Sequence, residues 1–210
     1  NPDGVIHGNY RCSLAATDLN RRFGNCNMYL HPTVYHLNRM LCHLQDTRGV
    51  LLYLDIHGHS KNKNAFFYGC DIVQQPEHWL RQDLANKTRM EILAQRVYCR
   101  IFPMILCSLS APSGKDKGSG GNDSTDKPSP GYFCYDDNKF AVSKSKKGTG
   151  RVVAWREIGI EGAYTIELSF CGVGNNKEGS ILKKAEQKRY EAFWSKNRSK
   201  LKKYIREANK

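Results

Sequence analysis

A chain of 210 residues is long enough for one domain with a substantial hydrophobic core. Its 40% hydrophobic and 25% charged residues exclude a disordered or fibrous protein, and no apolar run approaches the roughly 18 residues of a membrane span. The net charge of +13 is concentrated in residues 183–210, which hold eleven Lys and Arg against three Glu. Such a segment either attracts an acidic partner or is the solvated face of a helix.

The cysteines indicate the compartment. All eight are scattered through apolar contexts, and no two form a C-x-x-C pair. This pattern favours free thiols in a reducing compartment and hence the cytosol. The chain does not begin with Met, and no charged-then-apolar leader follows Asn1. We therefore expect a fragment of a longer protein, whose first residue indicates nothing about targeting.

Helical and strand patterns alternate along the chain. Residues 1–24 are rich in turn formers and indicate an ordered loop, and apolar spacing then predicts an amphipathic helix from Thr33 to about Gln45. Further patterns predict, in chain order, a strand within 51–60, a strand at 65–69, a helix from Pro76 to about Ile101, strands at 139–144 and 163–170, and a helix from about Ile181 to Ala208. This succession indicates an α/β layered domain.

One segment lacks the composition of a folded core. Residues 108–131 are dominated by Gly, Ser, Pro, Asp and Lys, so they bury too little apolar surface to offset their ordering entropy. Plausible core segments flank them on both sides. We expect a flexible surface insertion within one domain at 1–180, followed by the basic amphipathic helix at 181–210.

The strand predicted within 51–60 ends in an unusually polar sequence, "DIHGHS". Strand alternation places Asp55, His57 and His59 on one face of the strand. Gly58, on the other face, would let a backbone segment or a ligand approach closely. A neutral imidazole is the commonest metal ligand, and a carboxylate beside it can fix its tautomer. The alternative is a structural histidine satisfied by hydrogen bonds.

Two further groups of residues suggest chemistry. Glu167 lies among apolar residues of a predicted strand, where a carboxylate is costly unless it is ion-paired with an arginine or used as a general base. Arg11, Asn20, Arg21 and Arg22 offer hydrogen-bond donors suited to a carboxylate or a phosphate. Neither of the glycine-rich nucleotide-binding motifs is present, so nothing supports a nucleotide site.

Six segments together resemble a known family. They occur in the order in which zinc carboxypeptidases carry their active-site segments: "NPDGV", "GNYRCSLA", "DLNR", "DIHGHS", "KSKKGTGRVVAWREIGI" and "YTIELSFCG". The sequences of these segments are most similar to those of the cytosolic carboxypeptidases, the branch that trims glutamates from tubulin and other acidic tails. The resemblance covers roughly 1–24, 48–72, 95–107 and 132–172. It implies a mixed central sheet with flanking helices, zinc-carboxypeptidase-like and incomplete at the amino end.

The resemblance also implies a role for each site residue. His57 is the zinc ligand, and Glu167 is the general base and acid that acts on the water. Arg11 polarises the scissile carbonyl, while Asn20 and Arg21 hold the terminal carboxylate of the substrate. This division of labour is chemically coherent, because zinc acidifies its bound water and a bidentate arginine recognises a chain end.

The chain departs from the family pattern in its metal ligands. The family takes its other two zinc ligands from an H-x-x-E segment, and none of the seven histidines here has Glu three residues later. We therefore expect those ligands upstream of this fragment, which alone should be inactive. His59 is expected behind the metal ligand, without contact to the metal, and the role of Trp155 is left open. Ala16 stands where the family usually has glycine before "DLNR".

The leading hypothesis is a zinc metallocarboxypeptidase that removes carboxyl-terminal or side-chain-linked glutamates from acidic tails such as those of tubulin. Arg151, expected near the cleft, would suit such a substrate. The alternative is a catalytically inactive peptidase-like module that binds acidic tails through its basic surface. Nucleic acid and membrane partners are not expected, since no recognised nucleic-acid motif accompanies the charge. The resemblance implies a cytoplasmic location, on microtubules, cilia or basal bodies.

Overall fold

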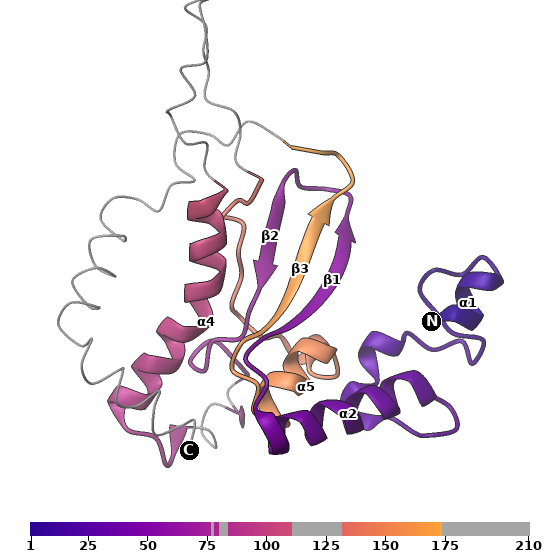
Figure 1. Ribbon diagram of the computed structural model, residues 1–210, viewed down its shortest axis with the longest axis horizontal. Coiled ribbons are helices and arrows are strands. Elements are labelled where there is room, and N and C mark those ends of the chain that lie inside the picture. Colours follow the sequence, from indigo (N-terminus) through magenta and orange to yellow (C-terminus); the bar gives the residue numbers. More distant parts are fainter. Residues whose placement is uncertain (77, 80–83, 111–131, 174–210) are drawn as a thin grey trace, which may run out of the picture. The chain divides into compact units, whose positions relative to one another are not determined.

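The computed structural model describes residues 1–76, 78–79, 84–110 and 132–173 (Figure 1). The helix predicted from Ile181 to Ala208 and most of the insertion at 108–131 lie outside these residues. The chain divides into two compact units, each assembled from separate segments. The first unit comprises Asn1–Asp55, Gly69–Cys99 and Phe140–Thr165, and the second comprises Ile56–Tyr68, Arg100–Lys139 and Ile166–Lys210.

The described residues form a mixed sheet of three strands, in the order β1–β3–β2. The strands are β1 (Tyr53–His59), β2 (Ala65–Tyr68) and β3 (Ala163–Ser169). In Figure 1, β1 and β3 run in the same direction and β2 runs against them. The predicted α/β class with a mixed sheet is confirmed. The first strand includes both histidines, as predicted, and begins at Tyr53.

Helix α2 (Pro32–Arg48) confirms the helix predicted from Thr33 to Gln45. Proline at its first turn suits the fixed φ and the missing N–H, and the helix ends before Gly49, whose φ of 73° is in the left-handed region. Val34 and Leu41 are its buried residues.

Helix α4 (Arg89–Leu109) contains the second part of the helix predicted from Pro76 to Ile101. His78, Trp79 and Leu84 are also helical, but residues 85–88 are not, so the predicted helix is interrupted before Arg89. Thr88 and Glu91 set the start of α4: the Glu91 N–H donates to Thr88 Oγ1 at 3.2 Å, and the Thr88 N–H donates to Glu91 Oε2 at 2.7 Å. This reciprocal capping box satisfies two N–H groups at the helix start. The helix also continues past Pro103, so Ser108 and Leu109, assigned to the insertion by composition, are helical.

By length and composition alone, α4 could span a membrane. Core helices of soluble proteins meet the same criterion, and Ala94, Val97 and Cys99 of α4 are buried within the protein. In the second unit, the rings of Phe102 and Phe133 both contact Phe67, one edge-on and the other stacked. Part of α4 therefore packs against other segments of the protein.

The strand predicted at 139–144 is wrong. Lys139 forms only an isolated bridge with Tyr68, and residues 144–146 form a 3₁₀ turn, η3 (Lys144–Lys146). Within the first unit, the Val142 N–H donates to the carbonyl of Gln74, which lies in a bend and not in a strand. The alternating pattern therefore buries Phe140 and Val142 without providing a strand for this segment to pair with.

The core of the first unit forms around three segments: the apolar side of α2, residues 70–72, and α5 (Gly150–Arg156). Its buried members are Leu41, Cys70, Ile72, Val142, Val152, Ala154, Trp155, Ile160 and Ala163. Trp155, 6% exposed, is thus a core side chain. No disulfide joins any of the eight cysteines, all of which lie in the described residues.

Short helical turns interrupt the segment predicted as loop at 1–24. They are α1 (Pro2–Ile6), η1 (Leu19–Arg21) and η2 (Phe23–Asn25). Before η1, a tight loop reverses the direction of the chain. The Ser13 N–H donates to the Thr17 carbonyl, and Cys12 and Asp18 form an isolated antiparallel bridge. Ala16 adopts a φ of 52° in this loop, the left-handed conformation that favours glycine.

Because alanine is strained in this conformation, we expect Ala16→Gly to stabilise the protein by about 1 kcal/mol. Chemical denaturation would measure the change. Ala15→Gly is the matched control, since Ala15 has no positive φ and glycine there should only add entropy to the unfolded chain. Equal effects of the two substitutions would show that the loop is not strained.

Candidate active site

His57 and Glu167 lie directly opposite each other on neighbouring parallel strands. At one end of the pair, the Tyr53 N–H donates to the carbonyl of Gly162, and at the other the Phe170 N–H donates to the carbonyl of His59. In a parallel ladder these bonds pair Tyr53 with Ala163 and His59 with Ser169. His57 therefore pairs with Glu167, and their side chains project from the same face of strands roughly 5 Å apart.

Glu167 is half-buried on this face. Among the described residues it forms no hydrogen bond or ion pair. The alternative that Glu167 is neutralised by an arginine therefore has no support in the described part of the chain. A half-buried carboxylate without a cation is available to accept a proton from a substrate or from water.

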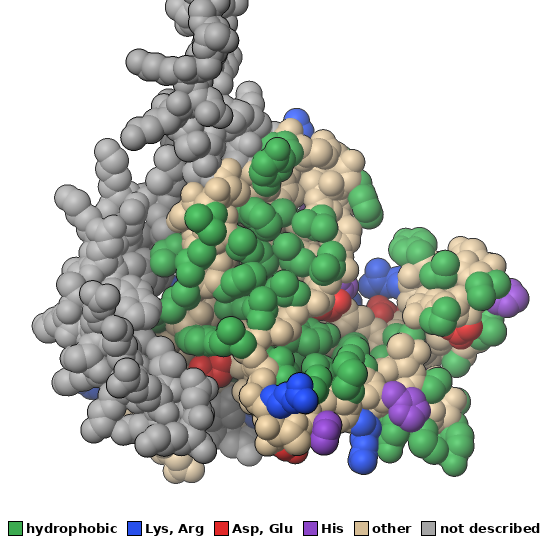
Figure 2. Space-filling model, in the orientation of Figure 1, with side chains coloured by type: hydrophobic (Ala, Val, Ile, Leu, Met, Phe, Trp, Pro, Cys, Tyr) green, Lys and Arg blue, Asp and Glu red, His purple; other side chains and the backbone are tan. Residues whose placement is uncertain are grey.

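The opposite face of the same strands in the second unit is apolar and exposed. Ile56 is 67% and Phe170 79% exposed, and Leu168 lies between them along the sheet. The Phe170 ring covers Gly58, where any side chain would clash with it, which explains the glycine between the two histidines. Figure 2 shows hydrophobic side chains gathered over the strands. The polar and apolar residues of β1 are thus cleanly separated by strand alternation.

His59 binds the loop that follows β1. Its Nδ1 accepts hydrogen bonds from the N–H groups of Lys61, at 3.1 Å, and Asn62, at 3.0 Å. Since Nδ1 is an acceptor, the neutral ring carries its hydrogen on Nε2. The ring also contacts Phe66 edge-on, with 5.1 Å between centroids. His59 therefore has a structural role beside His57.

This loop is in turn bonded to the end of the strand that carries Glu167. The Ser169 hydroxyl donates to the Asn62 carbonyl at 2.7 Å, and the Asn64 N–H donates to the Gly172 carbonyl at 3.0 Å. The ends of β1 and β3 are consequently held together by hydrogen bonds outside the strand ladder. Such bonds limit the movement of His57 relative to Glu167.

In the first unit, Asp18 brings two of the predicted site residues together. Its Oδ2 lies 3.3 Å from Nε of Arg11, and its Oδ1 accepts the backbone N–H of Asn20 at 3.0 Å. Arg11 is largely exposed, so the pair contributes little to stability, but it limits where the guanidinium can lie. Asp18 is a site residue that the sequence analysis did not identify.

The Asn20 amide group is held at both ends. Its Oδ1 accepts the Gly150 N–H at 2.9 Å, and its Nδ2 donates to Asp55 Oδ2 at 3.0 Å. Arg21 Nη1 donates to the Asn20 carbonyl at 2.7 Å. The structure thus brings together Arg11, predicted to polarise the scissile carbonyl, with Asn20 and Arg21, predicted to hold the terminal carboxylate.

Gly150 approaches its neighbours so closely that a side chain there would clash with the Tyr53 hydroxyl and the Phe23 ring. Burial raises the pKa of the Tyr53 phenol well above its ordinary value, and the charge of Asp55 raises it further. Tyr53 is therefore a neutral hydroxyl beside Gly150.

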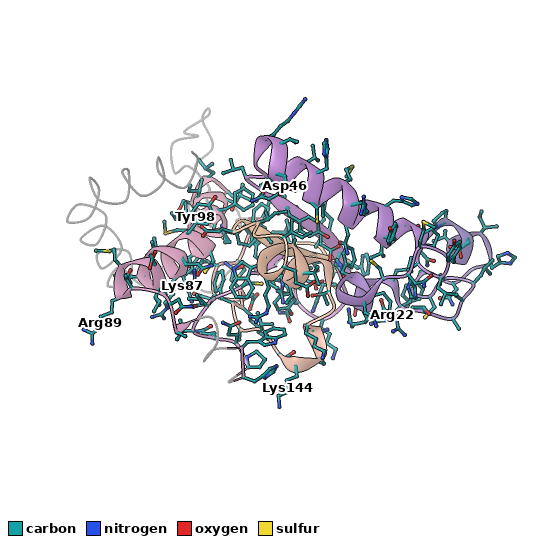
Figure 3. The ribbon with its side chains drawn as sticks, turned by 90° about the horizontal axis from the view of Figure 1, so that it is seen from below. Arg22, Asp46, Lys87, Arg89, Tyr98 and Lys144 are labelled. Atoms are coloured by element: carbon teal, nitrogen blue, oxygen red, sulfur yellow. The ribbon has the colours of Figure 1, made fainter. Side chains whose placement is uncertain are left out.

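Arg151 follows Gly150 but is only 5% exposed. Burial raises the pKa of the Cys70 thiol to about 11, while the charge of Arg151 acts in the opposite direction, so the guanidinium lies near this thiol. The role of Arg151 in substrate binding stays a prediction. The exposed basic residues of the unit lie elsewhere: Lys144 projects away from the ribbon in Figure 3, and Lys146 and Lys147 follow it.

The described residues provide only part of a metal site. His57 is half-buried near the end of its strand and has the chemistry of a zinc ligand. Within residues 1–76, 78–79, 84–110 and 132–173, however, no group of three His, Cys, Asp or Glu side chains could hold a metal ion. A zinc site that includes His57 would need further ligands from outside these described residues.

Comparison with known proteins gives matches along most of the chain. Cytosolic carboxypeptidase 1 of Gallus gallus is 40% identical over 178 residues, which are 84% of this chain and 12% of that protein. Cytosolic carboxypeptidase 3 of Mus musculus is 40% identical over 179 residues, 84% of this chain and 14% of that protein. The matched part of the chain belongs to the cytosolic carboxypeptidase family. This membership confirms the resemblance inferred from the six motifs.

The chain spans only about an eighth of the length of these relatives. No protein-family model matches it. Similar solved structures include metallo-carboxypeptidases from Burkholderia cenocepacia, 18% identical with a TM-score of 0.49, and Pseudomonas aeruginosa, 22% identical with a TM-score of 0.49. Each covers 81% of this chain, and this chain covers 34% of the first and 35% of the second.

The role of His59 in the loop leads to a prediction with a matched pair of variants. In His59→Asn, the amide oxygen can take the place of Nδ1, whereas in His59→Gln it lies one bond farther out. We expect the Gln variant to lose about 1–2 kcal/mol of local stability and the Asn variant much less. Hydrogen exchange at the Lys61 and Asn62 amides would measure this. Equal protection in both variants would contradict the assigned role.

Proposed function

We propose that this chain is part of the catalytic domain of a zinc metallocarboxypeptidase that removes glutamates from acidic protein tails. The observation that carries the proposal is the pairing of His57 with Glu167 on one face of neighbouring strands. A metal ligand and a general base must both reach the same water, and this register brings their side chains to one place. Membership in the cytosolic carboxypeptidase family supports the reaction class.

In this proposal, the residues of the chain divide the reaction between them. His57 is one of three protein ligands of a zinc ion, which when bound acts as a Lewis acid. Glu167 takes a proton from the attacking water and delivers it to the leaving amine. Arg11 supplies positive charge where the scissile carbonyl develops negative charge. Each of these side chains is either half-buried or exposed in the structure, so substrate can reach it.

Recognition of the chain end belongs to Asn20 and Arg21. A planar guanidinium and an amide can together hold both oxygens of a terminal carboxylate. Their backbone is fixed by η1 and by Asp18 before any substrate binds, which lowers the entropic cost of binding. Arg151 is proposed to interact with the glutamate side chain of the substrate. Because the Arg151 guanidinium is buried, either the substrate must reach into the protein or the Arg151 side chain must rotate toward it.

The proposed substrates are glutamates at the end of, or branching from, acidic tails such as those of tubulin. The net charge of +13 supports a polyanionic partner, because complementary charge raises the rate of encounter. The proposed location is the cytoplasm, on microtubules, cilia or basal bodies. The name of the cytosolic relatives supports the cytoplasmic part of this proposal.

One observation favours a second candidate, a non-catalytic module that binds acidic tails. The described residues contain no set of three metal ligands. The complete coding sequence separates the two candidates, since an H-x-x-E segment upstream would provide the missing ligands, and its absence would leave binding as the function.

Two variants of the complete protein test the catalytic proposal. We expect Glu167→Gln to abolish turnover of peptides that end in glutamate while zinc content stays near the wild-type value, because Glu167 moves protons and does not bind the metal. His57→Ala should instead lose zinc. Turnover numbers and elemental analysis of the purified proteins would measure both effects.

The matched control is Glu161→Gln, which makes the same chemical change just before β3 and should leave turnover unchanged. A Glu167→Gln variant that keeps more than a few per cent of the wild-type kcat would exclude Glu167 as the general base. Full zinc occupancy in His57→Ala would show that the ligand is misassigned.

A further inference from the structure

We propose that Asp55 is a positioning residue that fixes the orientation of the Asn20 amide for substrate binding. Asp55 lies 35 residues from Asn20 in the chain, yet its Oδ2 accepts the Asn20 Nδ2–H at 3.0 Å. The inference rests on the proposed function, in which Asn20 helps to hold the terminal carboxylate of the substrate.

Gly150 and Asp55, two partners of the Asn20 side chain, select one orientation of its amide. The Gly150 N–H can only donate, so it requires the Asn20 oxygen, at 2.9 Å. The Asp55 carboxylate can only accept, so it requires the Asn20 nitrogen. A rotation of the amide by 180° would place N–H against N–H and oxygen against carboxylate. Both contacts would then be repulsive, and the observed orientation is strongly preferred.

The orientation matters because a carboxylate ligand needs a donor. An amide offers a carboxylate its N–H₂ edge, whereas its oxygen edge repels the ligand. A carboxylate at Asp55 therefore determines which edge of Asn20 lies on which side before the substrate arrives. This is preorganisation of a recognition group, and it acts on substrate affinity more than on the chemical step.

The backbone of Asn20 does not depend on Asp55. Asp18 Oδ1 accepts the Asn20 N–H, the Arg21 guanidinium binds the Asn20 carbonyl, and the Arg21 N–H donates to the Asp18 carbonyl at 3.1 Å. Removing the Asp55 carboxylate should therefore weaken the hold on the amide orientation and leave the η1 segment in place. This separation makes the role testable.

The test uses the complete protein with Asp55→Ala and Asp55→Asn. The side-chain oxygen introduced by Asp55→Asn can still accept from Asn20, so this variant should keep a KM within about threefold of the wild type. Asp55→Ala should raise KM for glutamate peptides with a free carboxyl terminus by roughly tenfold, with kcat changed less than about twofold. If Asp55→Ala does not fold, Asp55→Ser takes its place, because serine is too short to reach Asn20.

A double-mutant cycle with Asn20→Ala distinguishes positioning from a general structural role. If Asp55 acts through Asn20, then Asp55→Ala should raise KM by less than about twofold in the Asn20→Ala background. Additive effects on KM would overturn the proposal, as would an Asp55→Ala variant that loses kcat at constant KM. Zinc content should be the same in all variants, because the substitutions leave the imidazole of His57, two residues further along β1, in place.

One measurement is decisive even if the proposed reaction is wrong. Gly150 donates to the oxygen of the same amide, so its N–H should exchange faster with solvent in Asp55→Ala and at the wild-type rate in Asp55→Asn. Unchanged exchange at Gly150 in Asp55→Ala would overturn the positioning role, whether or not the protein hydrolyses peptides.

Discussion

The parallel pairing of β1 with β3 is the constraint on which the candidate site depends. Side chains alternate between the faces of a strand, so a slip by one residue would move Glu167 to the apolar face. The flanking residues agree with this register: Ile56 and Phe170 lie on the apolar face, away from His57 and Glu167, and the Phe170 ring covers Gly58. The hydrophobic pattern thus determines which two functional groups meet.

The same pairing explains why one strand carries three charged or titratable residues in alternation. Asp55 binds Asn20, His59 binds the loop after β1, and His57 lies between them in the sequence, opposite Glu167. Polar groups on a half-buried face are costly unless hydrogen-bonded. Here the outer two have partners that orient neighbouring segments. The "DIHGHS" segment therefore combines one proposed metal ligand with two residues that organise its surroundings.

Sequence patterns predicted the elements whose stability is local. The helix at 33–45 and the three strands follow from apolar periodicity, whereas the roles proposed for His57 and Glu167 rest on the family resemblance. The pattern failed at 139–144, because alternation cannot show whether a neighbouring strand exists. It also failed at the start of α4, although Thr88 and Glu91 have the spacing of a capping box.

Other features of the site could not be obtained from periodicity at all. The contact between Asp55 and Asn20 joins residues that are distant in the chain, and the acceptance of two backbone N–H groups by His59 depends on the path of the loop after β1. The burial of Arg151, which was expected near the cleft, depends on how α5 packs into the core. The positive φ of Ala16 confirms that this position requires the glycine-like conformation suspected from the family motif.

The central claim is that this chain supplies one ligand and the general base of a metal site completed by residues outside it. The most direct measurement is the zinc content of the isolated 210-residue chain after dialysis, compared with that of the complete protein. A single imidazole leaves most coordination positions to water, so the isolated chain should retain far less than one zinc ion and the complete protein about one. One zinc ion per isolated chain, lost on replacement of His57, would contradict the account, because the chain would then contain a whole metal site of its own.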